Sequence, residues 1–169
     1  MKNILVPIGS VDGGKNSLQY AVNLAAISGA RVYFVNIYKE FSKVAGLTKV
    51  NQVMMDDSEA LLEGLISEVE TKGVEVLTRA IKGDPFMAIE RLTKKLDIDL
   101  IILSPQSVNK NAQLYLGSVT GKIVKQMDVP ILIVPKTYLF RKAETILLAF
   151  KRGYFEKEGV LDPLIDMAG

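Results

Sequence analysis

Five short apolar runs, separated by stretches with helical periodicity, constrain the fold of this chain more than any other feature of its sequence. The runs occupy residues 3–8, 31–37, 74–81, 99–104 and 130–135. Their hydrophobicity is continuous rather than alternating, which is typical of strands that are buried on both faces of a parallel sheet. We therefore expect an α/β protein built on an open, twisted sheet of five parallel strands.

Between these runs, apolar residues recur at the three-to-four spacing of amphipathic helices. Their positions are Leu18, Ala21, Val22 and Ala25; Leu61, Leu62, Leu65, Ile66 and Val69; Ile89, Leu92 and Leu96; and Leu116, Val119, Ile123 and Met127. Gly29 and Gly73 stand where C-terminal helix caps are expected, and Asp84-Pro85 is typical of an N-cap followed by proline at the first helical position. Strands and helices should therefore alternate, with residues 38–57 as a long connection and with ligands beyond the carboxyl ends of the strands.

The composition narrows the possible functions. The chain has neither cysteine nor histidine, which excludes thiol nucleophiles, Ser-His triads and the usual zinc or haem ligands. Its 21 basic and 19 acidic residues give a net charge of +2, too small to recruit nucleic acid or anionic lipid. The apolar start of the chain is too short to span a bilayer and lacks a small-residue cleavage site. We expect a cytoplasmic protein without a nucleic-acid partner, a membrane partner or a metal site.

Residues 9–16, GSVDGGKN, nearly match the phosphate-binding P-loop motif G-x-x-x-x-G-K-[ST]. A working P-loop needs a Ser or Thr hydroxyl directly after the lysine to bind magnesium, and a second strand that ends in Asp. Here Asn16 follows the lysine and Ser17 comes one residue late, while the candidate partner strand carries Asp99 at its entering end. A P-loop phosphotransferase is therefore the least favoured of the functions considered.

The glycines of this near-match have another interpretation. Gly13 and Gly14 can serve as flexible turn residues between a strand and a helix, because glycine adopts conformations that are closed to other residues. Lys15 is then a solvated side chain on the first helical turn. Under this interpretation the segment carries no nucleotide chemistry of its own.

A second resemblance extends over most of the chain. Three stretches carry it: ILVPI with KNSLQYAVNLA, GDPFMAIERL with LDIDLIILS, and LGSVTGKIVKQMDVPILIVP. Together they resemble the universal stress protein family, in register from residue 2 to about residue 136. The resemblance implies a doubly wound α/β domain over residues 1–136, with helices on both faces of the sheet.

Nucleotide-binding members of that family carry Asp in the loop after the first strand. They also carry a G-x-x-G segment that is followed by nine residues and then by G-[ST], and this motif surrounds the ATP phosphates. Gly117 and Ser118 match the last part of this motif, whereas the earlier glycines correspond to Ser104 and Ser107. The family Asp corresponds to Gly9. The positions that the resemblance marks as binding residues are Gly9, Ile37 on the adenine side, Ser104, Ser107, Gly117, Ser118 and Val119.

These substitutions oppose ATP binding in the family manner. Serine is strained in loop shapes that glycine adopts freely, and Pro105 removes one amide donor. The start of the helix at Gly117 can still bind an anion, or it can be an ordinary N-cap. The hydroxyls of Ser10, Ser104, Ser107 and Ser118 could line the same crevice and bind a smaller anion or polar ligand.

We therefore expect a non-catalytic binding or regulatory module with a degenerate ATP motif and no cofactor. The alternative is an adenine-nucleotide binder, of ATP or AMP, in which serines replace the motif glycines. Catalytic residues are expected in neither case.

Residues 137–169 resemble the start of a second copy of the domain. ETILLAFKRGYFEKEGVLDPLIDMA echoes KNILVPIGSVDGGKNSLQYAVNLA, which predicts a C-terminal strand at 145–150 and a short helix after it. Such a unit cannot bury its own apolar faces and must dock on its own domain, a partner chain or a missing repeat. Family dimers resemble pairs joined through the fifth strand, so we expect residues 131–134 at the sheet edge and a homodimer with residues 144–168 at its interface.

Overall fold

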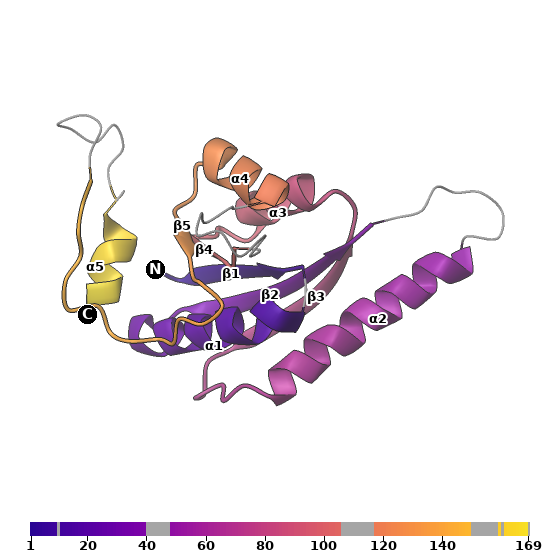
Figure 1. Ribbon diagram of the computed structural model, residues 1–169, viewed down its shortest axis with the longest axis horizontal. Coiled ribbons are helices and arrows are strands. Elements are labelled where there is room, and N and C mark those ends of the chain that lie inside the picture. The colour runs from indigo at the N-terminus through magenta and orange to yellow at the C-terminus, as the bar shows by residue number, and fades with distance from the viewer. Residues whose placement is uncertain (10, 40–47, 106–116, 150–158, 160, 169) are drawn as a thin grey trace.

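A parallel sheet with the strand order β3-β2-β1-β4-β5 forms the centre of the protein (Figure 1). The computed structural model describes residues 1–9, 11–39, 48–105, 117–149, 159 and 161–168. The strands are β1 (Asn3–Ile8), β2 (Arg31–Tyr38), β3 (Val76–Lys82), β4 (Leu100–Leu103) and β5 (Ile131–Ile133). All four strand pairs are parallel, which confirms the predicted sheet, and β5 lies at its edge as expected.

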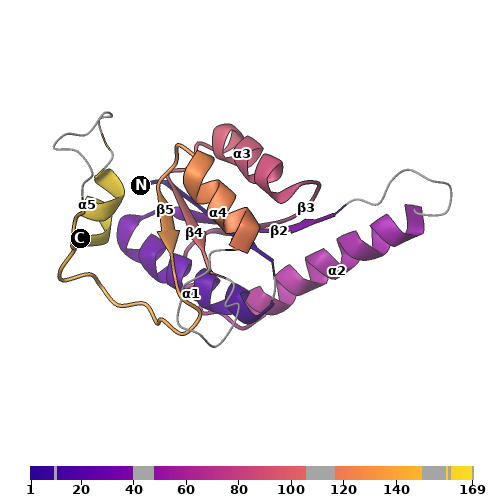
Figure 2. The ribbon, with the colours of Figure 1, turned by 45° about the horizontal axis from the view of Figure 1, so that its top comes forward.

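Helices cover both faces of the sheet, as the doubly wound architecture requires. The helices are α1 (Val11–Ser28), α2 (Thr48–Ser67), α3 (Pro85–Lys95), α4 (Gly117–Gln126) and the short α5 (Asp162–Ala168). Figures 1 and 2 show α1 and α2 on one face and α3 and α4 on the other. Among the described residues, no helix is long and apolar enough to cross a membrane.

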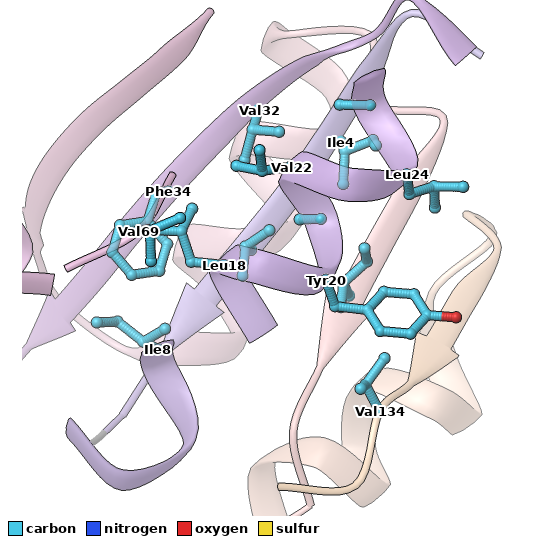
Figure 3. Close-up of a cluster of buried hydrophobic side chains, with 14 of the residues drawn as sticks. Ile4, Ile8, Leu18, Tyr20, Val22, Leu24, Val32, Phe34, Val69 and Val134 are labelled. Carbon is cyan, nitrogen blue, oxygen red and sulfur yellow. The ribbon is translucent and has the colours of Figure 1, made fainter. Parts of the chain in front are cut away.

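Two hydrophobic clusters, one on each face, hold these layers together. Along β1, Ile4, Val6 and Ile8 belong to the cluster under α1 and α2, whereas Leu5 belongs to the cluster under α3 and α4. Successive side chains of a strand point to opposite faces, so one strand supplies both cores. Figure 3 shows the first cluster, where Leu18 and Val22 of α1 lie against the sheet among residues that are almost fully buried.

Two of the predicted helix boundaries are confirmed by their capping contacts. Gly29 follows α1 with φ +71°, and its N–H donates to the carbonyl of Ala25 at 2.8 Å. Asp84 caps α3, because its carboxylate accepts the N–H of Met87 at 3.0 Å and Pro85 begins the helix. The conformation at Gly29 is one that glycine adopts without strain.

Other boundaries differ from the sequence expectation. Helix α2 begins at Thr48, so the second half of the predicted connection 38–57 is helical. It ends at Ser67, so Gly73, with φ +75°, lies in a later turn and is no helix cap. Gly13 and Gly14 lie inside α1 rather than in a turn before it, and Lys15 falls beyond the first turn of that helix. These residues are helical because tertiary packing outweighs the weak local preference of glycine.

The C-terminal extension was only partly predicted. Residues 145–149 form no strand, whereas a short helix, α5, is present. The apolar run at 145–149 has no neighbouring strand to complete a ladder, and Leu147 is 93% exposed. High β-propensity is not sufficient for a strand without a partner.

The extension nevertheless docks on its own domain. The side-chain amide of Asn16 on α1 donates to the carbonyls of Pro135 and Tyr138, both at 3.1 Å. Phe140 stacks edge-on against Tyr20, with 5.0 Å between ring centroids. Figures 1 and 2 show α5 beside the N-terminus, where the amino group of Met1 pairs with Asp166. Described parts of the extension thus pack against α1.

Candidate functional site

A cavity of about 260 Å³ opens at the carboxyl ends of β1 and β4. Because β1 and β4 are adjacent and parallel, their ends meet at one edge of the sheet. The apolar lining of the cavity includes Ile8, Ile37, Ile89 and Leu103. Its polar side consists of Ser17, Ser104, Ser118, Thr120 and Lys136. Ligands of open α/β sheets bind in this position, so the cavity is the candidate site.

Five of the seven predicted binding positions line this cavity: Gly9, Ile37, Ser104, Ser118 and Val119. Gly117 begins α4 directly before Ser118. Ser107 lies outside the described residues, as does Ser10. The structure therefore brings five of the seven positions together from different loops, and a binding role for them stays a prediction.

A buried polar network fixes the strand ends that face the cavity. The side-chain amide of Asn36 on β2 donates to the carbonyl of Ile8 at 3.0 Å. The hydroxyl of Ser58 on α2 donates to Asn36 Oδ1 at 2.6 Å. Asn36 and Ser58 are both buried. The network gives their polar side-chain groups partners, and buried groups without partners would lower the stability of the fold. The network holds Gly9 and Ile37, which follow the bonded residues, in fixed positions at the cavity.

The start of α1 approaches the end of β4 very closely. A Cβ placed on Gly13 would lie 3.1 Å from both Cβ and Oγ of Ser104. A Cβ on Gly14 would lie 2.8 Å from Cδ1 of Leu65 on α2. A side chain at either position would therefore crowd a neighbouring residue. This close packing between elements replaces the interpretation of Gly13 and Gly14 as turn residues.

Two buried hydroxyls at the cavity, those of Ser17 and Ser104, have no hydrogen-bond partner among the described residues. Ser17 is 2% exposed, and its Oγ contacts no donor or acceptor. The Oγ of Ser104 is also buried and unpaired. Polar groups that are buried in proteins are nearly always satisfied. These two hydroxyls are therefore candidate donors to a polar group of a ligand in the cavity.

The electrostatic character of the cavity is cationic. Lys136 lines it, and no Asp or Glu belongs to the described lining. Among the described residues, Lys136 forms no hydrogen bond or ion pair, whereas Lys15 pairs with Glu68 at 2.7 Å. The described residues contain no group of three His, Cys, Asp or Glu side chains that could hold a metal ion.

The parts of the P-loop near-match do not come together. Lys15 is more than half exposed and does not line the cavity. Asn16 is engaged with the C-terminal extension. At the opposite end of the sheet, the carboxylate of Asp99 accepts the N–H groups of Lys2 and Asn3 at 2.6 and 2.9 Å. Asp99 therefore joins β1 to β4 and lies far from any phosphate that Lys15 could reach.

Sequence reasoning missed Thr120 and Lys136 and considered Ser17 only as a misplaced P-loop residue. A signal for Lys136 was present, because it directly follows the fifth apolar run and so lies at a carboxyl strand end. No sequence signal shows that Ser17 lines the cavity, because this depends on which face of α1 is turned toward β4.

Comparisons with known proteins agree with this architecture. The sequence model of the universal stress protein family matches residues 1–135. A universal stress protein of Methanocaldococcus jannaschii is 24% identical over 141 residues, which cover 80% of this chain and 82% of that protein. The structure of UspA from Lactobacillus plantarum superimposes with a TM-score of 0.65 at 24% identity, over 79% of this chain and 97% of the other. A universal stress protein from Archaeoglobus fulgidus in complex with dAMP gives a TM-score of 0.56 at 14% identity, over 79% and 97% of the two chains.

Proposed function

Because the chain belongs to the universal stress protein family, we propose that it is a cytoplasmic, non-catalytic binding or regulatory module. Its ligand occupies the cavity at the ends of β1 and β4, and the ligand is not ATP held in the family manner. The chain contains no histidine or cysteine to serve as a general base or nucleophile, which supports a binding role.

The side chain of Ser104 carries this proposal. It stands at the first glycine position of the family motif, and its Cβ and Oγ fill the space against Gly13. A glycine there leaves the backbone open to phosphate oxygens, whereas a serine side chain covers it. Pro105 lines the same wall and has no N–H to donate. Gly9 offers no carboxylate to a ribose hydroxyl, so both ends of the ATP-binding arrangement are altered.

Mass spectrometry of the protein as purified tests the proposal. Freshly purified full-length protein is denatured, and the released small molecules are identified and quantified against the protein. We expect a small ligand, or a free cavity, without stoichiometric ATP. Release of one ATP per chain would contradict the proposal, and magnesium-dependent hydrolysis of added ATP would contradict its non-catalytic part.

An adenine nucleotide with fewer phosphates is a second candidate. Two observations support it: the universal stress protein from Archaeoglobus fulgidus whose structure contains dAMP, and the apolar lining of the cavity, which includes Ile37. A monophosphate does not need the missing glycine loop to the extent that a triphosphate does. Calorimetric titration with AMP and with ATP separates the two candidates, because binding of AMP alone supports this second function.

A further inference from the structure

Lys136 is held at the cavity by a turn that is anchored to α1. The turn runs from Pro135 to Tyr138 and is closed by the N–H of Tyr138, which donates to the carbonyl of Pro135 at 2.9 Å. The carbonyls of Pro135 and Tyr138 also accept hydrogen bonds from the side-chain amide of Asn16, each at 3.1 Å. The backbone of Lys136 is therefore fixed, and its side chain extends along the cavity wall.

Lys136 and Ser104 converge on one point of that wall. The position of a Cβ on Gly13 would be 3.7 Å from Lys136 Cε and 3.1 Å from Ser104 Oγ. Ser17 lines the same cavity one turn further along α1, with its hydroxyl buried and unpaired. Two unsatisfied hydroxyls and an ammonium group without a partner among the described residues thus border one space.

We infer that the cavity binds a small organic anion whose phosphate or carboxylate group is held by Lys136, with Ser17 and Ser104 as hydroxyl donors. The inference rests on the proposed binding role of the cavity and names the chemistry of its ligand. An anion satisfies all three groups at once, and no carboxylate in the described lining repels it. The lysine ammonium thereby supplies a charged donor for the anion.

The apolar lining and the size of the cavity indicate the nature of the rest of the ligand. Ile8, Ile37, Ile89 and Leu103 face a space of about 260 Å³. Cavities for drug-sized ligands are usually about 300 to 1,000 Å³, so this space suits a smaller molecule. We expect a compact apolar body, such as one aromatic ring, with a single anionic group at one end.

Calorimetric titration of the full-length protein with three matched probes tests the inference. Phenyl phosphate, benzoate and phenol share an aromatic ring and differ in the attached group. The wild type should bind phenyl phosphate or benzoate at least about tenfold more tightly than phenol, as expected for a hydrogen-bonded charged group. The stronger of the two anions identifies the ligand as a phosphate or a carboxylate.

Three variants locate the anion. Lys136→Met keeps the length of the side chain without its charge and should abolish the preference for the anion, whereas Lys136→Arg should retain it. Lys15→Met is the matched control, because Lys15 is ion-paired at the surface and does not line the cavity. It should bind as the wild type does. Thermal unfolding of each variant verifies that it is folded.

The inference is overturned if no probe binds, if phenol binds as tightly as the anions, or if Lys136→Met binds like the wild type. The binding role itself is judged separately by the co-purified ligand. A neutral molecule released from the purified protein would leave that role intact and reject the anion. An empty cavity together with three silent titrations would reject both.

Discussion

At the scale of single residues, two buried serines differ in whether their hydroxyl groups have a hydrogen-bond partner among the described residues. Ser58 and Ser17 lie on helices and are 4% and 2% exposed. The hydroxyl of Ser58 donates to Asn36 and supports the strand ends, whereas the hydroxyl of Ser17 has no partner. An unpaired buried hydroxyl lowers stability, so its presence beside the cavity is consistent with a function in binding.

Replacing each serine by alanine should therefore have opposite effects on stability. Ser58→Ala leaves Asn36 Oδ1 without its donor and should lower the free energy of unfolding by about 1 to 3 kcal/mol. Ser17→Ala removes an unsatisfied group and should raise that free energy by up to about 1 kcal/mol. Urea unfolding of the two variants measures both values. Equal losses would show that the hydroxyl of Ser17 has a partner within the protein.

The residues that line the cavity were only partly predictable from the sequence. Gly9, Ile37, Ser104, Ser118 and Val119 were identified by resemblance, and all five line the cavity. Ser17 and Lys136 were missed in this role because no local pattern records which residues of a helix and a later turn share a wall. Residues of that kind become visible only after α1, β4 and the turn at 135–138 have been packed together.

At the scale of elements, the strands were predicted more accurately than the helix boundaries. Continuous apolar runs identify buried strands directly, because both of their faces require apolar residues. The start of α2 was not predicted, because its first turns are not buried against the sheet: Val50 and Val53 are 38% and 56% exposed. The strand expected at 145–150 was wrong over its described part, because a strand also depends on a neighbour that the sequence does not specify.

The contact between α1 and the extension should weaken at alkaline pH. Burial of Tyr20, and secondarily its proximity to Tyr138, raises the pKa of the Tyr20 phenol. The stabilisation that the buried, neutral phenol of Tyr20 contributes is fully present below the pKa of tyrosine in the unfolded chain, about 10. It is lost as the pH rises through the higher folded-state pKa, because the unfolded state then releases its proton first. The free energy of unfolding should therefore fall in this range.

Tyr20→Phe tests this expectation, because it removes the titrating group and keeps the ring against Phe140. Its free energy of unfolding should decline less than that of the wild type between pH 8 and a pH above about 10. Tyr33→Phe, on β2, controls for the loss of a tyrosine elsewhere. Identical declines in the wild type and Tyr20→Phe would reject the assignment.

At the scale of the whole molecule, we propose a homodimer formed through β5 and the C-terminal extension. The edge strand β5 has one free side within the described sheet. Close to the end of the chain, Leu147 is 93% exposed and Leu148 is 43% exposed. A free strand edge and exposed apolar side chains are features of surfaces that pair with another chain. The division into a domain at 1–136 and an extension at 137–169 stays a prediction.

Sedimentation equilibrium of a charged variant tests the dimer. Leu147→Asp should weaken self-association without lowering the stability of the monomer, because the side chain is almost fully solvated. Val53→Asp on α2 is the control, since Val53 is 56% exposed and its helix packs against the β2 and β3 side of the sheet. The proposal fails if the wild type is monomeric at high concentration or if both variants dimerise equally well.

We propose above all that the cavity of this universal stress protein does not hold ATP in the family manner. Thermal unfolding of the full-length protein with and without magnesium and excess ATP tests it most directly. ATP at 100 times its dissociation constant would add about 2.7 kcal/mol and raise the midpoint by several degrees. We predict an unchanged midpoint with ATP, because under this proposal Ser104, Pro105 and Gly9 stand where groups that bind ATP would be needed. A rise of several degrees that saturates with ATP concentration would contradict the account.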